Sequence, residues 1–340
     1  MSLTVDNLFV TGGNAFATFP PFQERWPWIG GDLQTLRNRI SHRAPDFSPY
    51  PAERLSLAMT DGTGDCLAAI LNRPRKDTGK PAIVLVHGLT GSEDSRNIQT
   101  SAAYHLSRGH PAVRLNLRGA GPSCGRCKDH YHAGRSQDLR DAIAALPADI
   151  SSRGLVLVGV SLGGNVLLKF LGENDGMARV IAAATVCAPI DLKRAQMQIG
   201  APRNAVYEKH LLTEMRADAL AMAGARRAEV ERTLQDVRSV YAFDDKIVAP
   251  NNGFAGAEDY YRRSSAAQFL GAIRVPTLLI HARNDPWIPA AMYLERDWPA
   301  DHPTTLLMAP GGGHVGFHGR GGAVLWHDRC IGLFFDHASA

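Results

Sequence analysis

Residues 154–173, GLVLVGVSLGGNVLLKFLGE, place one serine in a glycine-rich turn between a short apolar run and a helical pattern. The run before the turn is apolar and β-branched, which is typical of a central parallel strand, and residues 165–173 repeat apolar side chains at helical spacing. A turn this tight crowds the backbone, and Gly159 and Gly163 relieve the crowding because they lack a Cβ atom. The pattern G-x-S-x-G between a strand and a helix predicts a nucleophile elbow, which lifts Ser161 to the top of a sheet.

Other segments with strand character alternate with helical stretches along most of the chain. They are residues 54–60, 66–72, 81–87, 112–119, 180–189, 276–283 and 304–310, with helical patterns near 136–147 and 322–335. The first two are joined by the turn DGTGD, which predicts an antiparallel pair. The later alternation predicts an α/β fold, with a mostly parallel central sheet of about eight strands and helices on both faces.

Two parts of the chain stand apart from this alternation. Residues 1–50 are rich in proline and aromatic residues, and we expect an N-terminal arm that wraps a domain formed by residues 51–340. Residues 191–250 show no clear strand and have the pattern of several amphipathic helices. Their position after the sixth strand predicts a helical cap over the carboxyl ends of the strands, and additional packing helices are the alternative.

Charge and composition exclude several classes of protein. The 37 Lys and Arg residues are interspersed with 33 Asp and Glu residues, so the net charge of +4 contains no run suited to nucleic acid. The longest apolar runs have the length of a strand rather than of a transmembrane segment, and the first ten residues lack a secretory pattern. Five cysteines, an odd number, do not suggest a disulfide framework. We expect a cytoplasmic protein; its oligomeric state is not predicted.

One cysteine and histidine cluster resembles a metal site. Cys124, Cys127, His130 and His132 are residue types that bind zinc. Structural zinc sites usually bring two ligand pairs separated by a longer loop, whereas these four residues lie within nine positions. No thioredoxin-like context surrounds the two cysteines. We therefore expect a loop beside the active site, with no metal and no organic cofactor.

A glycine-rich turn can also be purely structural, so a catalytic serine requires partners elsewhere. A serine hydroxyl is a poor nucleophile and needs a base to take its proton and an acid to orient the base. With an elbow of this kind the acid follows the serine along the chain, and the base follows the acid. Asp285 lies just beyond strand 276–283, where it can reach over the top of the sheet. Asp244 and Asp245 follow no strand, so we expect them to be solvated or structural.

His314 is the candidate base. It follows strand 304–310 and three glycines, a loop that can carry an imidazole back over the serine. His318 is the main competitor because it lies four residues further on. His302 precedes the strand and should lie on the far side, and His281 lies inside an apolar strand, where a buried histidine with a hydrogen bond is expected.

Fixed N–H donors must face the negative charge that develops on a carbonyl oxygen under attack. The Leu162 amide is one candidate, because it follows the serine at a helix N-terminus whose dipole favours an anion. The second should come from the loop HGLTG, in which the Leu89 amide is the first choice and the Thr90 amide the alternative. Gly88 and His87 should shape this loop, with His87 in a structural role.

Several blocks of sequence carry a resemblance to a known family. They are GGDLQTL at 30–36, HGLTGSEDS at 87–95, RGAGPSCGR and YHAGRSQDLR within 118–140, GVSLGGNVLLKFLGE at 159–173, AEDYYRRSSA at 257–266, ARNDPWIP at 282–289 and GGGHVGF at 311–317. Together they resemble the YheT-like branch of the α/β-hydrolases, across nearly the whole chain. The resemblance implies a serine hydrolase of carboxylic esters, with eukaryotic relatives linked to lipid esters and to acyl transfer to alcohols, and a triad of Ser161, Asp285 and His314. Two departures, Asp32 where the family often has His and Asn97 where it often has an aromatic residue, concern the entrance or the arm.

We predict a hydrolase of short- to medium-chain acyl esters, small molecules that it cleaves through an acyl-enzyme. Acyl transfer to an alcohol, or thioester cleavage, is the alternative with the same three residues. A ligand sensor without turnover is the alternative of another class, although no site residue is visibly lost. Met197, Met215 and Met222 of the insertion are candidates to line the acyl site because thioethers adapt to varied chains, with core packing as their other possible role.

Overall fold

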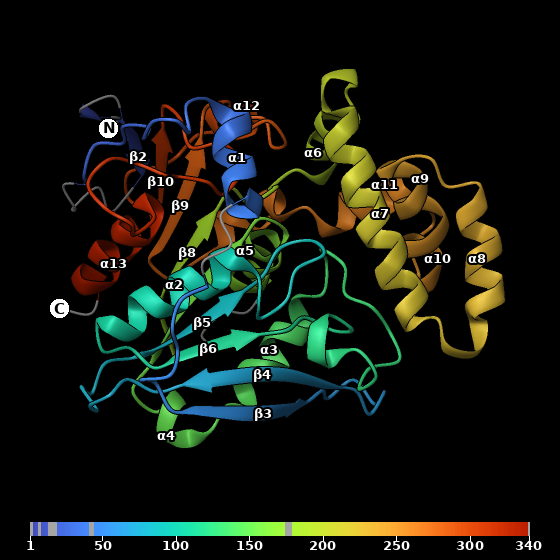
Figure 1. Cartoon of the computed structure of the whole chain (residues 1–340), viewed down its shortest axis with the longest axis horizontal. Coiled ribbons are helices and arrows are strands. Elements are labelled where there is room, and N and C mark those ends of the chain that lie inside the picture. The colour runs from blue at the N-terminus through green and yellow to red at the C-terminus, as the bar shows by residue number, and fades with distance from the viewer. Residues whose placement is uncertain (1–2, 6–7, 13–18, 41–43, 174–178, 339–340) are drawn as a thin grey trace.

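A computed structural model describes residues 3–5, 8–12, 19–40, 44–173 and 179–338 of the 340-residue chain. Its strands form one sheet of ten, in the order β1-β2-β10-β9-β8-β7-β5-β6-β4-β3 (Figure 1). They are β1 (Leu3–Val5), β2 (Leu8–Gly12), β3 (Ala52–Ala58), β4 (Cys66–Asn72), β5 (Ala82–Val86), β6 (Ala112–Leu115), β7 (Leu155–Val160), β8 (Val180–Val186), β9 (Thr277–Ala282) and β10 (Thr304–Ala309). Strands β5 to β10 run parallel, and antiparallel pairing adds the outer strands on both sides.

The predicted α/β class and the mostly parallel sheet are confirmed. The eight strands expected from the sequence correspond to β3 to β10. The sheet is larger than expected because β2 pairs antiparallel with β10, Leu307 opposite Val10, and β1 pairs with β2. Residues 1–50, expected as an arm, thus contribute the two outermost strands on one side of the sheet and also helix α1 (Gly31–Ile40).

Helices cover both faces of the sheet. Those of the main body after α1 are α2 (Arg96–Ser107), α3 (Ser136–Ala144), α4 (Ala148–Ser151), α5 (Leu162–Glu173), α12 (Ala291–Leu294) and α13 (Trp326–Ala338). Successive side chains of a strand point to opposite faces. Accordingly Leu157 of β7 belongs to the buried cluster that includes α3 and α5, whereas Val158 belongs to the cluster that includes α2 and α13.

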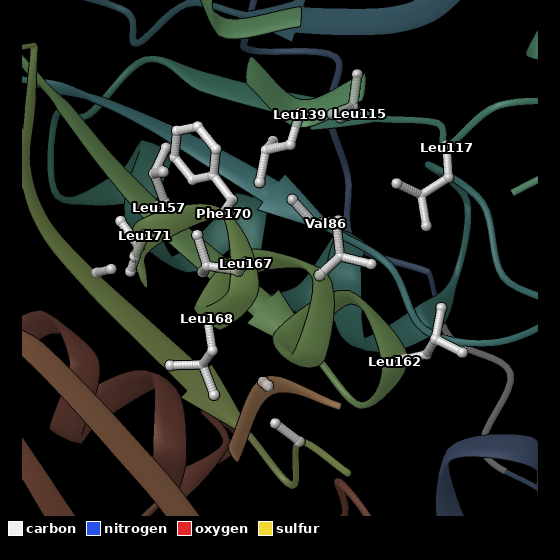
Figure 2. Packing of buried hydrophobic residues seen from close by; sticks show 14 of the residues in the cluster. Val86, Leu115, Leu117, Leu139, Leu157, Leu162, Leu167, Leu168, Phe170 and Leu171 are labelled. Carbon is white, nitrogen blue, oxygen red and sulfur yellow. The ribbon is translucent and has the colours of Figure 1, made fainter. Parts of the chain in front are cut away.

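Helix α5, which follows the elbow, is buried over most of its length. Figure 2 shows its Leu167, Phe170 and Leu171 gathered with Leu157 of β7 and Leu139 of α3. Each of these side chains is at most 5% exposed. Burial of an apolar side chain of this size contributes about 1.5–3 kcal/mol, so the helix that follows the elbow is firmly seated on the sheet.

The chain between β8 and β9 is helical, as the sequence pattern predicts. It forms α6 (Leu192–Ile199), α7 (Ala205–Met222), α8 (Arg227–Gln235), α9 (Val240–Phe243), α10 (Ala249–Asn251) and α11 (Ala257–Ser264). Short 3₁₀ helices in this part are η2 (Pro202–Asn204), η3 (Gly224–Arg226), η5 (Ala266–Gln268) and η6 (Leu270–Ala272), and η4 (Asp244–Val248) is a π-helix. A further 3₁₀ helix, η1 (Gly121–Ser123), precedes β7. Figure 1 shows α7 to α10 gathered to one side of the sheet. Side chains such as Leu211, Met215 and Leu234 form a separate buried cluster there.

Candidate active site

Ser161 stands between the end of β7 and the start of α5, with a φ angle of 51°. This left-handed conformation is uncommon for a residue with a side chain and marks a strained turn. A Cβ atom at Gly159 would lie 2.6 Å from the Gly163 carbonyl oxygen, and one at Gly163 would lie 2.3 Å from the His87 carbonyl oxygen. Only glycine fits at both positions, so the pattern of the sequence has a direct steric cause.

The structure brings Ser161, His314 and Asp285 together. The Ser161 Oγ atom lies 2.9 Å from His314 Nε2, and His314 Nδ1 lies 2.8 Å from Asp285 Oδ2. The three residues follow the carboxyl ends of β7, β9 and β10, which meet at one edge of the parallel sheet. A carboxylate only accepts hydrogen bonds, so the imidazole carries its proton on Nδ1 and offers Nε2 to the serine hydroxyl.

Asp285 is held as a carboxylate. Its Oδ1 atom accepts hydrogen bonds from the amides of Trp287 and Ile288, at 2.8 and 3.0 Å. Burial alone would raise the pKa of Asp285, but the charge and hydrogen bond of His314, together with the Trp287 amide, outweigh burial and lower that pKa below its usual value. On the other side of the base, the Trp287 ring stacks on the His314 ring with 4.5 Å between centroids and 26° between planes. Trp287 is a contact that sequence reasoning missed, although it lies two residues after Asp285 in the segment ARNDPWIP.

The other candidate histidines have other partners. Arg37 Nη1 lies 2.6 Å from His318 Nδ1, and burial followed by the Arg37 charge lowers the pKa of His318 to about 3. His281 stacks on Tyr293 and pairs through Nε2 with a backbone carbonyl oxygen. His302 contacts the Thr304 hydroxyl at the opposite end of β10 from His314.

The two acidic residues set aside in the sequence lie in the insertion. Buried Asp244 accepts a hydrogen bond of 2.6 Å from the Tyr261 hydroxyl, and burial raises the pKa of Asp244 to about 7. Asp245 accepts from the Ala257 amide. Their hydrogen bonds thus tie the end of the insertion to α11, and Asp244 also lines the cavity beside the serine.

Both residues whose amides are the candidate oxyanion donors, Leu162 and Leu89, line the same cavity as Ser161. Leu162 is the first residue of α5, where N–H groups have no acceptor within the helix. The Thr90 amide, the alternative for the second donor, instead donates to the Tyr131 hydroxyl at 2.6 Å. The Thr90 amide thus already has an acceptor, so Leu89 stays the candidate for the second donor, and Tyr131 is a second contact that sequence reasoning missed.

Gly88 and His87 shape the loop that carries Leu89. A Cβ atom at Gly88 would lie 3.0 Å from Ser161 Cβ, so this loop passes directly beside the serine. His87 is fully buried, with Nδ1 2.8 Å from the Gly88 carbonyl oxygen and Nε2 accepting from the Leu117 amide. Burial lowers the pKa of His87 to about 4, so this ring is a neutral connector of the loop.

A cavity of about 380 Å³ opens at the serine. Insertion side chains supply much of its apolar lining, namely Leu192, Ile199, Leu211, Met215, Val240 and Phe243. Of the three candidate methionines, Met215 lines this cavity and is 5% exposed, whereas Met197 is 62% exposed. Met222 lines a separate, smaller hollow. Of the three candidates, Met215 thus belongs to the wall of this cavity, whereas Met197 and Met222 do not.

The two departures from the family pattern, Asn97 and Asp32, lie in different places. Asn97 lines the cavity. Asp32, at the start of α1, accepts hydrogen bonds from Arg203 and from the Tyr207 hydroxyl of α7, at 2.8 and 2.9 Å. It thus joins α1 to the insertion at the protein surface.

Residues of the cysteine and histidine cluster contact different partners. The Cys127 thiol lies 3.5 Å from the Cys66 carbonyl oxygen, His132 Nδ1 accepts from the Gly134 amide, and His130 Nδ1 pairs with the Tyr131 carbonyl oxygen. In the described part of the chain, ligand atoms of Cys187, His281 and Asp285 do lie within 4.8 Å of one another. That trio does not suit a metal: burial raises the pKa of Cys187 well above its usual value, which disfavours the thiolate ligand, and Asp285 already binds His314.

A serine at a strand-to-helix elbow, paired with a histidine and an acid at the carboxyl edge of a parallel sheet, defines the α/β-hydrolase class of architecture. Comparison with known families agrees. Residues 81–320 match the family model described as alpha/beta hydrolase fold, and the chain belongs to this family. The resemblance inferred from the sequence is thereby confirmed.

Individual relatives are similar over most of the chain. YheT of Escherichia coli (strain K12) is 32% identical over 91% of this chain and 90% of its own length. A monoacylglycerol lipase of Saccharomyces cerevisiae is 29% identical over 71% of this chain and 56% of its own length. Among solved structures, the Pyrococcus furiosus esterase Pf2001 superposes with a TM-score of 0.56 at 13% identity, covering 87% of this chain and 98% of its own, which shows a shared fold. No helix within the described ranges combines the length and apolar character that crossing a membrane requires.

Proposed function

We propose that this protein is a serine hydrolase of carboxylic esters. The observation that carries the proposal is the chain of hydrogen bonds from Ser161 through His314 to Asp285 at the mouth of an apolar cavity. Nucleophile, base and orienting acid are the parts that acyl transfer to a serine needs. The yeast relative named as a monoacylglycerol lipase also supports an ester substrate.

Each residue has a defined step in this mechanism. Ser161 Oγ attacks the ester carbonyl carbon while His314 Nε2 takes its proton, and Asp285 stabilises the imidazolium that forms. The amides of Leu162 and Leu89 donate to the oxyanion of the tetrahedral intermediate. His314 then protonates the departing alcohol, and water activated by the same imidazole releases the acid from the acyl-enzyme.

We also propose that residues 191–250 act as a cap on a catalytic domain of residues 51–340 and select short- to medium-chain acyl groups. Support comes from the insertion side chains in the cavity wall, such as Leu211 and Phe243. Each methylene of an acyl chain buried there adds up to about 0.8 kcal/mol of binding free energy. The cavity volume of about 380 Å³ limits the length of acyl chain that fits.

A fluorophosphonate probe and a series of p-nitrophenyl esters from acetate to palmitate test the proposal. The wild-type protein should be labelled once, at Ser161, and should hydrolyse the shorter esters. Ser161→Ala should abolish labelling and reduce turnover by several orders of magnitude, leaving the small background of the oxyanion donors. Folded Ser161→Ala with turnover near that of the wild type would refute the assignment, and absence of labelling in the wild type would favour a sensor without turnover.

Added alcohol distinguishes hydrolysis from acyl transfer. If water is the second nucleophile, free acid should be the main product of p-nitrophenyl butyrate even when ethanol is present. Ethyl butyrate as the main product would assign acyl transfer to the same three residues.

A further inference from the structure

The loop that carries His314 has an unusual backbone. Gly312 and Gly313 have φ angles of 128° and 58°, and Val315 and Phe317 have φ angles of 59° and 47°. Glycine adopts positive φ freely, but a β-branched valine and a phenylalanine do so only where surrounding structure compels them. The loop therefore needs contacts from outside itself to keep His314 in place.

Helix α1 supplies those contacts. The Thr35 hydroxyl accepts a hydrogen bond of 2.8 Å from the His314 amide and donates one of 2.7 Å to the Gly31 carbonyl oxygen. One turn further on, the Asn38 side-chain amide donates to the Val315 carbonyl oxygen at 3.2 Å. Donation to Gly31 fixes the direction of the Thr35 hydroxyl, so its lone pair faces the amide of the base.

Gln34 extends the same set of contacts to the far end of the loop. Its Oε1 atom accepts from the His318 amide at 2.7 Å, and its Nε2 atom donates to the His318 carbonyl oxygen at 3.1 Å. Three positions of one helix thus bind the backbone of three loop residues. These pairs are separated by roughly 280 positions in sequence, so tertiary packing alone creates them.

The attachment of α1 is polar rather than apolar. Gln34 is fully buried, whereas Leu33 is 43% exposed and Ile40 is 57% exposed. A helix that merely covers a core normally buries an apolar stripe. The helix and the loop are also in close backbone contact, since a Cβ atom at Gly313 would lie 2.2 Å from the Gly31 carbonyl oxygen.

We propose that α1 is a positioning element of the active site and that Thr35 holds the catalytic base in register with Ser161 and Asp285. The proposal rests on the role of His314 proposed above. Thr35 acts through the His314 backbone, so it is a positioning residue. The imidazole must meet two partners at 2.9 and 2.8 Å at once, and a displacement of about 1 Å can lower turnover about 100-fold.

The experiment compares Thr35→Val with Thr35→Ser. Valine has the shape of threonine but loses both hydrogen bonds, whereas serine keeps the hydroxyl. For p-nitrophenyl butyrate, kcat of Thr35→Val should fall about 10- to 100-fold with KM changed less than 3-fold, and its rate constant for fluorophosphonate labelling should fall in parallel. Thr35→Ser should stay within about 3-fold of the wild type, because it restores the contact.

Thr233→Val in α8 is the matched control. Its hydroxyl donates to the Glu229 carbonyl oxygen four residues earlier, as Thr35 does to Gly31, and its side chain is partly buried like that of Thr35, but it does not line the cavity. This variant should keep the kcat of the wild type. Equal small decreases of kcat in Thr35→Val and Thr233→Val would show that Thr35 only stabilises its own helix.

Folding and the proposed function are tested separately. Circular dichroism and the labelled fraction at completion report how much Thr35→Val is folded. If that variant does not fold, Asn38→Leu, which removes the bond to the Val315 carbonyl, should lower kcat about 3- to 10-fold. A folded Thr35→Val, or in its place a folded Asn38→Leu, with the kcat of the wild type would overturn the role of α1. Ser161-dependent turnover would survive that result, whereas turnover retained in Ser161→Ala would refute the proposed function itself.

Discussion

At the scale of single residues, His314 is the point on which the candidate site converges. Asp285 contacts one ring nitrogen, Ser161 contacts the other, and Trp287 covers one face of the ring. The Cys187 thiol lies behind the acid, 3.7 Å from the Gly313 carbonyl oxygen. The base is thus enclosed by groups that fix its orientation, while the serine side remains open to the cavity.

Replacing each of the two neighbouring histidines, His314 and His318, with alanine tests this arrangement. His314→Ala should lower kcat/KM for p-nitrophenyl butyrate by several orders of magnitude, because Ser161 then has no base. His318→Ala should cost less than about 10-fold, since its ring contacts Arg37 and does not reach the serine. Steady-state kinetics on both folded variants provide the measurement. The opposite ranking would move the role of base to His318.

At the scale of elements, the insertion supplies the apolar wall of the cavity. Helices α6, α7 and α9 each contribute side chains to it, and their own buried cluster ties them into one layer. Met215 belongs both to that cluster and to the cavity wall. The length of the acyl chain accepted should therefore depend on this helix layer more than on the sheet.

Enlarging Met215 should shorten the preferred acyl chain. Met215→Trp fills part of the cavity, so octanoate hydrolysis should fall at least 10-fold relative to acetate hydrolysis. The control is Met197→Trp, because Met197 is 62% exposed on the neighbouring helix and should leave the profile unchanged. The ratio of kcat/KM values for p-nitrophenyl octanoate and acetate is the measurement. Equal loss of both activities in Met215→Trp would indicate a general disturbance of packing and contradict the acyl-site role.

At the scale of the whole molecule, burial changes the pKa of most of the histidines. The pKa is lowered by burial, as the largest cause, for His87, His105, His110, His130, His132, His281, His318 and His327. Burial acts in the opposite sense on three acids, raising the pKa of Asp218 to about 6 and those of Asp244 and Asp328 to about 7. The buried histidines and the three buried acids therefore have opposite effects on the way stability changes with pH.

The pH dependence of stability follows from the balance between the buried histidines and the three buried acids. A buried histidine with a lowered pKa binds fewer protons folded than unfolded below about pH 6.5, so its contribution is present at neutral pH and lost on acidification. The three acids bind more protons folded than unfolded, so they stabilise the fold as the pH falls through 7 and 6. Histidines outnumber them, and the free energy of unfolding should fall by about 2 kcal/mol or more from pH 7.5 to 5.5.

Urea unfolding at the two pH values measures this change. His327→Gln removes one buried titrating group, so its loss of stability between pH 7.5 and 5.5 should be smaller than that of the wild type by about 1 kcal/mol. A free energy of unfolding that rises on acidification would show that the three acids dominate instead.

Much of this molecule follows from local sequence patterns. The apolar, β-branched runs predicted β3 to β10, because burial on both faces demands such side chains. The glycines of the elbow were predictable since their neighbours leave no room for a Cβ atom. Ser161, Asp285 and His314 could be nominated because each follows a strand, and parallel strands end at a common edge.

Other features depend on contacts that no local pattern encodes. The pairing of β2 with β10 joins residues almost 300 positions apart, and it turned an expected arm into a sheet edge. Met215 and Met197 are alike in sequence context, but only the packing of α6 and α7 placed one inward and the other in solvent. His314 and His318 lie four positions apart, yet Ser161 meets the first and Arg37 the second. Local patterns thus determined which residue types could serve the site, and long-range packing decided which of them meet, because a hydrogen bond requires atoms within about 3 Å and only the folded chain sets that distance.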